Sequence, residues 1–462
     1  MKKKTFTQLL SNSFIILGTL LFSCTESDNL LDPADSGPNQ SNQTQLTLEE
    51  IKTLNVSMQG AFVSEDHASQ KANAFFGKVS TKTNSSEKSR RTYWVKYTSA
   101  LPQMFSSDSK PDSIPIYLIN YKDGSSILIS GDERIPEVLA YSNNNSISLE
   151  KNGSGLDVII DNLPAFVSYK IDNFESRYDS LLQISLQKTG LSASSVPLQR
   201  IENNLSQWET IYDYAPMVPV KWDQDGLYNQ LFPPIADKDG SLAHAHAGCT
   251  AVATAQILAY YKYPSIIRNY AYHWQLMTSS PQIGGLDITG QKDIQNLLFD
   301  IAKNCNPSYS SSGTGISHHD ANTYIKNIGY TTDGVQQYNK DKVVNSIKNY
   351  HPVLTVGNRI DERNNYKGHA WVIDGANARQ QTYTEQIYEY IGTNPKPANP
   401  INPEEWRLIS DITQIYKEEY VRCNFGYGGD YDDVNYNHEL FRLANGREYI
   451  YDLEIITNIT PK

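Results

Sequence analysis

The spacing of apolar residues predicts two folded regions along the chain. In the first region helix-like and strand-like stretches alternate, and Lys122-Asp123-Gly124 gives the strongest hairpin signal. Its predicted elements are a helical pattern over 47–76, a polar loop over 81–91, strands over 114–120 and 126–130, and a helix over 162–182. This order predicts a small α+β domain that ends near residue 190.

In the second region helical patterns come first and strand patterns follow. The predicted helices cover 250–261, 293–303, 321–328 and 341–350, and the predicted strands cover 352–357, 369–375, 381–391, 420–424 and 448–456. Helices followed by strands indicate an α+β domain with a helical half, an antiparallel-sheet half and a cleft between them. Residues 394–403 hold four prolines and predict a loop between strands.

Polar stretches set the boundaries of these regions. Residues 25–46 are rich in Ser, Asn, Gln, Asp and Pro, and bury too little apolar surface to fold, so we expect a flexible tether. Residues 189–196 are rich in Gly and Ser, which predicts an exposed linker. We therefore divide the folded part into a first domain, 47–190, a linker, 191–214, and a second domain, 215–462.

The first 24 residues have the pattern of an export signal. Lys2, Lys3 and Lys4 precede an apolar stretch over 14–22, which is too short for a permanent membrane helix. Because Cys24 directly follows a Leu-x-Ser sequence, the segment resembles a bacterial lipoprotein signal, in which this cysteine becomes the lipid-bearing N-terminus. A plain secretory signal is the alternative. Both predict export, and the first predicts anchoring in the cell envelope, with the outer membrane as the expected site.

Composition narrows the classes of partner. The 462 residues carry a formal charge of −11, and no basic block is long enough to form a phosphate-binding face. We therefore expect no nucleic-acid partner, and nothing in the sequence calls for a cofactor. The four cysteines are too few for a disulfide framework, although Cys305 and Cys423 could pair.

Cys249 lies where a small, polar loop becomes a helix. Residues 250–261 are rich in Ala, contain neither Gly nor Pro, and stop before Pro264, so the pattern predicts a mostly buried helix. The unpaired N–H groups and positive dipole end of its first turn favour a thiolate, which is the nucleophilic form of cysteine. The alternative is a structural cysteine that packs as a small hydrophobe.

A cysteine nucleophile needs a base and a group that orients the base. His369 stands in Gly-His-Ala-Trp-Val-Ile-Asp-Gly on a predicted strand, and Asn424 ends another strand before a glycine-rich turn. Cys, His and Asn in this chain order are typical of papain-like proteases. A metal site is a competing interpretation, because His244, His246 and Cys249 are close together and His318-His319 could complete a zinc site. Its spacing does not match the usual zinc motifs, so we expect no metal.

Three segments of the second region resemble the streptopain-like cysteine peptidases of bacteria, a branch of the papain-like fold. Residues 247–257, followed by Tyr263-Pro264, are similar to the nucleophile helix of that family, and Gly368-His369-Ala-Trp-Val-Ile-Asp-Gly is similar to its base motif. Residues 222–233 resemble the segment in which a glutamine, here Gln224, supplies the side chain of the oxyanion hole. The resemblance covers roughly residues 215–460.

The first domain resembles the pro-domain of the same family, most clearly over residues 130–141, Ser-Gly-Asp-Glu-Arg-Ile-Pro-Glu-Val-Leu-Ala-Tyr. The resemblance implies a papain-like peptidase domain preceded by a small α+β inhibitory pro-domain, and therefore a zymogen. It implies that Cys249 is the nucleophile, His369 the base and Asn424 the orienting group, with protein or peptide substrates. It also makes 191–214 the activation region.

One motif departs from the family. The usual Asn-Trp-Gly-Trp-Gly-Gly is here Asn424-Phe425-Gly426-Tyr427-Gly-Gly. We expect the Phe425 ring to shield the Asn–His hydrogen bond from water, less completely than a tryptophan would. The sequence thus predicts an exported, lipid-anchored cysteine endopeptidase zymogen. The alternative is an inactive homologue that serves as a surface binding protein.

Overall fold

The protein is described here from a computed structural model of the chain. The structure describes residues 61–77, 87–98, 113–150, 156–188, 199–236, 240–310, 313–360, 366–391, 404, 406–430, 432, 434–441 and 453–462. The predicted signal and tether, the helical pattern over 47–60 and the proline-rich loop lie outside these residues. Within the described residues no helix combines the length and apolar character that a bilayer crossing needs.

The first region is a helix–sheet–helix unit. Its elements are α3 (Glu65–Phe75), β1 (Glu87–Lys96), β2 (Ser113–Tyr121), β3 (Ser126–Ser130), β4 (Val138–Ser142) and α4 (Leu156–Lys188). The predicted hairpin is confirmed: β2 and β3 pair antiparallel, Gly124 takes φ +92°, and Asp123 accepts a hydrogen bond from the Ser125 N–H. The order of elements confirms the small α+β unit.

The prediction of a loop over 81–91 is wrong from residue 87 onward. Residues 87–96 form β1, which pairs along its length with β2. Most of its side chains are exposed or half-buried. The strand lacks an apolar alternation because it forms the outer edge of the sheet, where main-chain hydrogen bonds to β2 hold it in place.

The segment that resembles a family pro-domain contains a buried ion cluster. The Arg134 guanidinium lies 2.7 Å from a carboxylate oxygen of Asp132 and 2.9 Å from one of Glu175 on α4. All three side chains are almost fully buried. The cluster therefore ties the β3–β4 connection to α4, and it satisfies charges that would otherwise be costly to bury.

The described part of the predicted linker segment, 191–214, is largely a pair of strands. Residues Gln199–Leu205 and Glu209–Tyr214 form β5 and β6, and both pair antiparallel with the long strand β16 (Tyr366–Tyr390). These strands form because β16 extends far enough to present an unused edge to the passing chain. The Gly- and Ser-rich residues 189–196, for which the sequence predicts an exposed linker, lie outside the described residues.

The second region contains the predicted helices and strands together with several short ones. Its helical elements are α5 (Cys249–Tyr261), α6 (Trp274–Met277), η1 (Ile283–Gly285), α7 (Ile288–Lys303), α8 (His318–Asn327), α9 (Lys340–Lys348) and η3 (His438–Phe441). Its further strands are β7 (Pro234–Ala236), β8 (Leu242–His244), β9 (Ile266–Ile267), β10 (Tyr270–Ala271), β11 (Ser308–Ser310), β12 (Gly313–Gly315), β13 (Tyr330–Thr331), β14 (Val335–Gln337), β15 (Val353–Ile360), β17 (Trp406–Asn424), β18 (Asn435–Asn437), β19 (Glu454–Ile456) and β20 (Thr460–Pro461).

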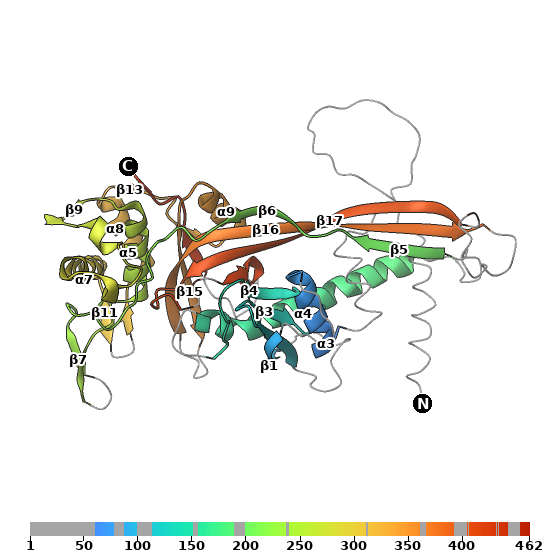
Figure 1. Cartoon of the computed structure of the whole chain (residues 1–462), viewed down its shortest axis with the longest axis horizontal. Coiled ribbons are helices and arrows are strands. Elements are labelled where there is room, and N and C mark those ends of the chain that lie inside the picture. Colours follow the sequence, from blue (N-terminus) through green and yellow to red (C-terminus); the bar gives the residue numbers. More distant parts are fainter. Residues whose placement is uncertain are drawn as a thin grey trace, which may run out of the picture.

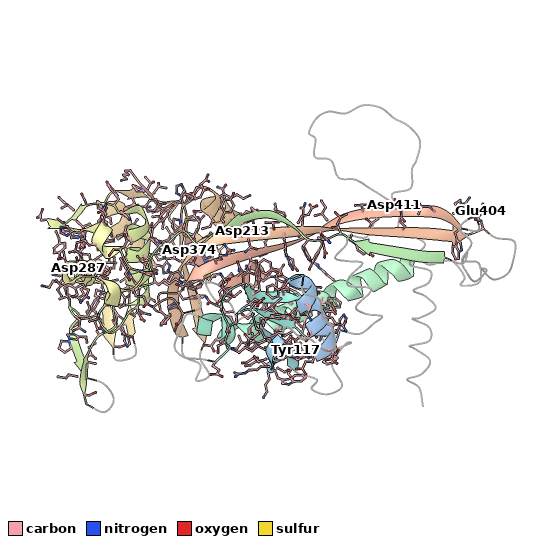
Figure 2. The ribbon with its side chains drawn as sticks, in the orientation of Figure 1. Tyr117, Asp213, Asp287, Asp374, Glu404 and Asp411 are labelled. Carbon is pink, nitrogen blue, oxygen red and sulfur yellow. The ribbon has the colours of Figure 1, made fainter. Side chains whose placement is uncertain are left out.

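Strands β16 and β17 form one hairpin that reaches away from α5, α7 and α8. The strands predicted at 369–375 and 381–391 are both parts of β16, because the chain between them continues the ladder with β17. Figure 1 shows α5, α7 and α8 at one end of the molecule and the hairpin extending toward the other. Asp374 lies near the base of this hairpin, while Asp411 and Glu404 lie at its far end (Figure 2).

The two regions share one sheet. Its strand order is β1-β2-β3-β4-β18-β17-β16-β15-β19-β14. The junction is the antiparallel pair of β4 with β18, in which Tyr141 faces Asn435. The first region thus adds its strands edge-on to the sheet of the second, in the manner of β-augmentation.

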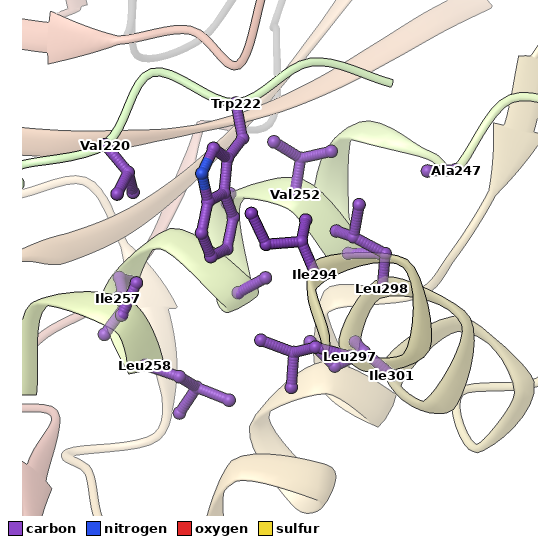
Figure 3. Packing of buried hydrophobic residues seen from close by; sticks show 14 of the residues in the cluster. Val220, Trp222, Ala247, Val252, Ile257, Leu258, Ile294, Leu297, Leu298 and Ile301 are labelled. Atoms are coloured by element: carbon purple, nitrogen blue, oxygen red, sulfur yellow. The ribbon is translucent and has the colours of Figure 1, made fainter. Parts of the chain in front are cut away.

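Neighbouring residues of β16 belong to two different cores. Ala370 and Val372 pack in a cluster with α5, α7 and Trp222, which Figure 3 shows from close by. Trp371 and Ile373 pack in a second cluster with β2, α4 and Phe425. The alternation of side chains along a strand explains this division, so the sheet separates a face covered by α5 from a face covered by the first region.

Candidate active site

Cys249 is the first residue of α5, as the sequence predicts. The Ala-rich run buries the helix between the sheet and α7. Gly248 precedes it at φ +91°, and a Cβ on Gly248 would lie 3.0 Å from the Thr314 carbonyl oxygen. Only glycine adopts this positive φ without strain and leaves room for the Thr314 carbonyl, so Gly248 fixes how the chain enters the helix.

The loop before α5 is braced by hydrogen bonds to residues 314–316. The Thr250 hydroxyl donates to the Ile316 carbonyl oxygen at 3.0 Å, and the Thr314 hydroxyl donates to the His246 carbonyl oxygen at 2.6 Å. These contacts hold both sides of Cys249 against the chain that leads into α8.

The Cys249 thiol lies against β16. Its Sγ accepts a hydrogen bond from the Ala370 N–H at 3.3 Å. Burial nevertheless raises the pKa of this thiol, and it outweighs the hydrogen bonds that act in the lowering direction. The direction is opposite to the one expected from the helix start, because desolvation disfavours the charged form.

His369 is the residue before Ala370 on β16, and its side chain is buried. Its Nε2 lies 2.9 Å from the Phe425 carbonyl oxygen, and its ring stacks on Tyr427 with centroids 5.1 Å apart. Since a carbonyl oxygen only accepts, Nε2 carries the proton in this contact. In the neutral ring Nδ1 is then the basic nitrogen.

The structure does not give Asn424 the contact with the imidazole that the sequence reasoning assigned to it. The Asn424 amide nitrogen donates to the Val220 carbonyl oxygen at 2.8 Å, and its oxygen accepts from the Gly426 N–H at 3.2 Å. The contact on the His369 ring comes from the main chain of the next residue instead. Asn424 supports the strand and turn around the histidine.

The Phe425 ring lies 6.5 Å from the His369 ring between centroids, but the described residues form no Asn424–His369 hydrogen bond for it to shield. Its ring is fully buried in the second cluster, 5.9 Å from Trp371 and 5.7 Å from Tyr436 between centroids. This burial fixes the carbonyl that receives the imidazole proton. Sequence reasoning missed the carbonyl because every residue has one, so only the fold distinguishes it.

Gln224 reaches the neighbourhood of Cys249 through its main chain. Its carbonyl oxygen accepts from the N–H of Ala247, two residues before the cysteine, at 2.9 Å. The main-chain N–H of Trp222 donates to the Gln256 side-chain oxygen on α5. The main-chain carbonyl of Trp222 accepts from the Gly428 N–H. Figure 3 shows the Trp222 ring beside α5 near Val252. The segment thus joins the cysteine helix to the glycine-rich turn.

The zinc site considered around Cys249 does not form. The His244 ring contacts the Phe232 carbonyl oxygen at 2.6 Å, whereas the His246 ring pairs with Asp225. Among the residues that the structure describes, the His, Cys, Asp and Glu side chains that converge as metal ligands could are His318, His319 and Glu454.

The other cysteines do not join the site. Within the described ranges Cys249, Cys305 and Cys423 are all free thiols, so the pairing of Cys305 with Cys423 does not occur. Cys305 lies in the cluster around α5 and Cys423 in the cluster shared with the first region. The predicted lipidation residue Cys24 lies outside the described residues.

Family comparisons divide the chain in the same way as its fold. Residues 222–435 match the Peptidase C10 family, and residues 60–165 match the Spi protease inhibitor family. Streptopain from Streptococcus pyogenes is 26% identical over 309 residues, which cover 57% of this chain and 69% of streptopain.

Two solved structures from Prevotella intermedia are also similar. A fragment of prointerpain A with a cysteine-to-alanine mutation is 17% identical, with a TM-score of 0.47, and the match covers 80% of this chain and all of the fragment. Active wild-type interpain A, a cysteine protease, is 20% identical, with a TM-score of 0.35, and the match covers 53% of this chain and 94% of that protein.

Proposed function

We propose that this chain is a streptopain-like cysteine endopeptidase of the Peptidase C10 family with an N-terminal inhibitor domain, and we propose a catalytic mechanism and a cellular address for it. The proposed nucleophile is Cys249 and the proposed base is His369. The observation that carries the assignment is that the Cys249 thiol, at the start of α5, receives the N–H of Ala370, the neighbour of His369 on β16.

In the proposed reaction, removal of the pro-domain lets the thiol proton pass to His369. The thiolate then attacks the peptide carbonyl carbon, and the bond to the nitrogen breaks as His369 returns the proton to the leaving amine. Water, deprotonated by the same imidazole, hydrolyses the thioester and regenerates the thiol. The Cys249 N–H and the Gln224 side chain are proposed donors to the oxyanion, each worth on the order of 3 kcal/mol in such sites.

The Phe425 carbonyl is proposed to hold the His369 ring during this cycle. It accepts the Nε2 proton and therefore leaves Nδ1 as the nitrogen that exchanges a proton with sulfur. It also stabilises the imidazolium, because both nitrogens donate in that state. Asn424 has a supporting role in this proposal, through the Val220 main chain.

The pro-domain inhibits by its attachment to the peptidase sheet. Besides the β4–β18 ladder, Lys170 of α4 pairs with Glu439, and the Tyr141 hydroxyl donates to Asn377 at 3.1 Å. Cys249 itself packs against residues of the second region alone, so its raised pKa is expected in both forms. Because the matched inhibitor domain stays attached until processing, we expect the thiol to react slowly in the zymogen and quickly afterwards.

Covalent labelling tests the assignment. The purified zymogen and its processed form would be treated with an epoxide inhibitor of cysteine peptidases and analysed by peptide mass spectrometry. We expect adduct on Cys249 mainly in the processed form. Cys249→Ala should abolish labelling and casein hydrolysis, and Cys305→Ala, which keeps the nucleophile, should retain both. Casein hydrolysis by Cys249→Ala at the parent rate would refute the mechanism, and a processed form without adduct would favour a binding protein.

The proposed address is the bacterial cell envelope, with Cys24 as the lipid-bearing residue. Support comes from the basic start, the short apolar stretch and the Leu-x-Ser-Cys ending of residues 1–24. Cells that express the chain would be grown with tritiated palmitate. Label that survives detergent extraction should disappear in Cys24→Ser. Equal label in both proteins, or label in neither, would leave a plain secretory signal as the explanation.

A further inference from the structure

Three side chains that are able to bind a metal converge, and none of them is among the residues proposed for catalysis. His318 and His319 begin α8, and Glu454 begins β19. One ligand atom from each lies within 4.8 Å of the others. The two imidazole rings are 4.6 Å apart between centroids, and His318 Nε2 is 2.6 Å from Glu454 Oε2.

The closest pair in this cluster is not a hydrogen bond. His318 Nε2 is buried and has no hydrogen-bond partner within the described part of the chain, although the Glu454 carboxylate lies at ion-pair distance from it. In a neutral imidazole whose Nε2 carries no proton, this nitrogen and the carboxylate oxygen are both acceptors. Two acceptors this close repel each other unless a proton or a metal cation lies between them.

We propose that His318, His319 and Glu454 bind a divalent transition-metal ion of the zinc class. Two imidazoles and one carboxylate are a ligand set that zinc uses when a fourth position is left for water or another group. His318 and Glu454 retain about a fifth of their side-chain exposure, and His319 is exposed, so one side of the cluster is open for a water ligand. Imidazole donors disfavour magnesium and calcium, which prefer oxygen ligands.

The position of the cluster gives the ion a structural consequence. Glu454 faces Val356 of β15 in the sheet, and Val356 faces Ala370 of β16 on its other side. On the helical side, Ile316 precedes α8 by two residues and accepts the Thr250 hydroxyl. An ion at this site would therefore link the helical and sheet halves close to the Cys249–Ala370 contact.

Metal binding can be measured independently of peptidase activity. The full-length Cys249→Ala protein would be titrated with Zn²⁺ by calorimetry, followed by thermal unfolding with and without the metal. We expect one ion per chain and a higher Tm with Zn²⁺. Co²⁺ should give visible bands without thiolate charge transfer, because the proposed ligands contain only nitrogen and oxygen.

Variants locate the site. His319→Ala and Glu454→Gln should each weaken Zn²⁺ binding at least 10- to 100-fold, the loss that even an outer-shell change causes. His244→Ala with His246→Ala is the matched control and should keep the parent affinity. Circular dichroism of the metal-free variants checks that they fold. The proposal is overturned if the parent binds no Zn²⁺, if the two site variants bind as tightly as the parent, or if only the control variant loses binding.

Discussion

The two faces of β16 are built from different parts of the chain. The face toward α5 packs against residues 218–459 alone, whereas the opposite face packs against both the peptidase and the pro-domain. The Cys249 thiol accepts the N–H of Ala370, whose side chain packs on the first face. The Phe425 carbonyl contacts the His369 ring, and the Phe425 side chain packs on the second face. Loss of the pro-domain should therefore leave the support of the cysteine intact and alter the support of the histidine.

The largest expected effect comes from Arg379, which joins the pro-domain, the linker strands and β16. Its Cζ lies 3.5 Å from the centroid of the Phe75 ring and 4.0 Å from that of Trp208, and its Nε donates to Glu418 at 2.8 Å. Arg379→Ala leaves the Glu418 carboxylate buried without its cation. We expect the free energy of unfolding of the Cys249→Ala zymogen to fall by about 3–5 kcal/mol in urea titrations.

Arg379→Lys is the control for this clamp. It keeps the charge near Glu418 but loses the planar group that stacks between the two rings. The free energy of unfolding of Arg379→Lys should lie between that of the parent and that of Arg379→Ala. Equal stability of all three proteins would mean that Arg379 does not tie the pro-domain to the peptidase.

A paired core substitution tests the division between the two faces. Ile171 of α4 is fully buried in the shared cluster, and Leu298 of α7 is fully buried in the α5 cluster. Either one changed to Ala should destabilise the zymogen by about 2–5 kcal/mol. Only Leu298→Ala should also destabilise the processed peptidase, because that form has lost α4. An Ile171→Ala zymogen as stable as the parent, or a processed Leu298→Ala peptidase as stable as the parent, would contradict the division.

A smaller effect is expected from the pH dependence of Asp374, which lies near the base of the hairpin (Figure 2). Burial raises the pKa of this carboxyl to about 7, although its Oδ2 accepts the Val218 N–H at 3.1 Å. The folded pKa exceeds the unfolded value of about 3.9, so its contribution to stability is complete below pH 4 and is lost as the pH rises through 7.

Urea titrations of the Asp374→Asn protein should expose this contribution. Between pH 5 and pH 7 the parent should lose about 2 kcal/mol more stability than the variant, because the variant has no proton to release. Parallel curves for the two proteins across this range would show that Asp374 is ionised in the folded state at lower pH than expected.

The smallest effect is expected from the ion pair of Lys170 with Glu439, which crosses between the pro-domain and the peptidase. Both side chains keep partial contact with solvent. Lys170→Met, which preserves much of the apolar stem, should cost the zymogen less than about 1 kcal/mol, and added salt should reduce the difference. A larger, salt-independent loss would indicate that this pair is a principal attachment.

Several elements follow from local sequence patterns, and the structure confirms them. The Ala-rich run without Gly or Pro forms α5, and the Asp-Gly turn joins β2 to β3. The α+β class of both regions is also confirmed. Strand β1 escaped prediction because its side chains carry no apolar alternation at the edge of the sheet. The linker strands escaped because their partner β16 lies more than 150 residues away.

The sequence by itself determined the candidates for chemistry: a cysteine at a helix start, a histidine on a strand, and a glycine-rich turn after Asn424. The tertiary structure decided which atoms meet. It directed the Asn424 amide to Val220 and gave the imidazole a main-chain carbonyl at Phe425. It also reversed the expected pKa shift of Cys249, because desolvation depends on all neighbouring elements and not on the helix start alone. Local patterns fix residue types and elements, whereas contacts between distant segments fix geometry and charge.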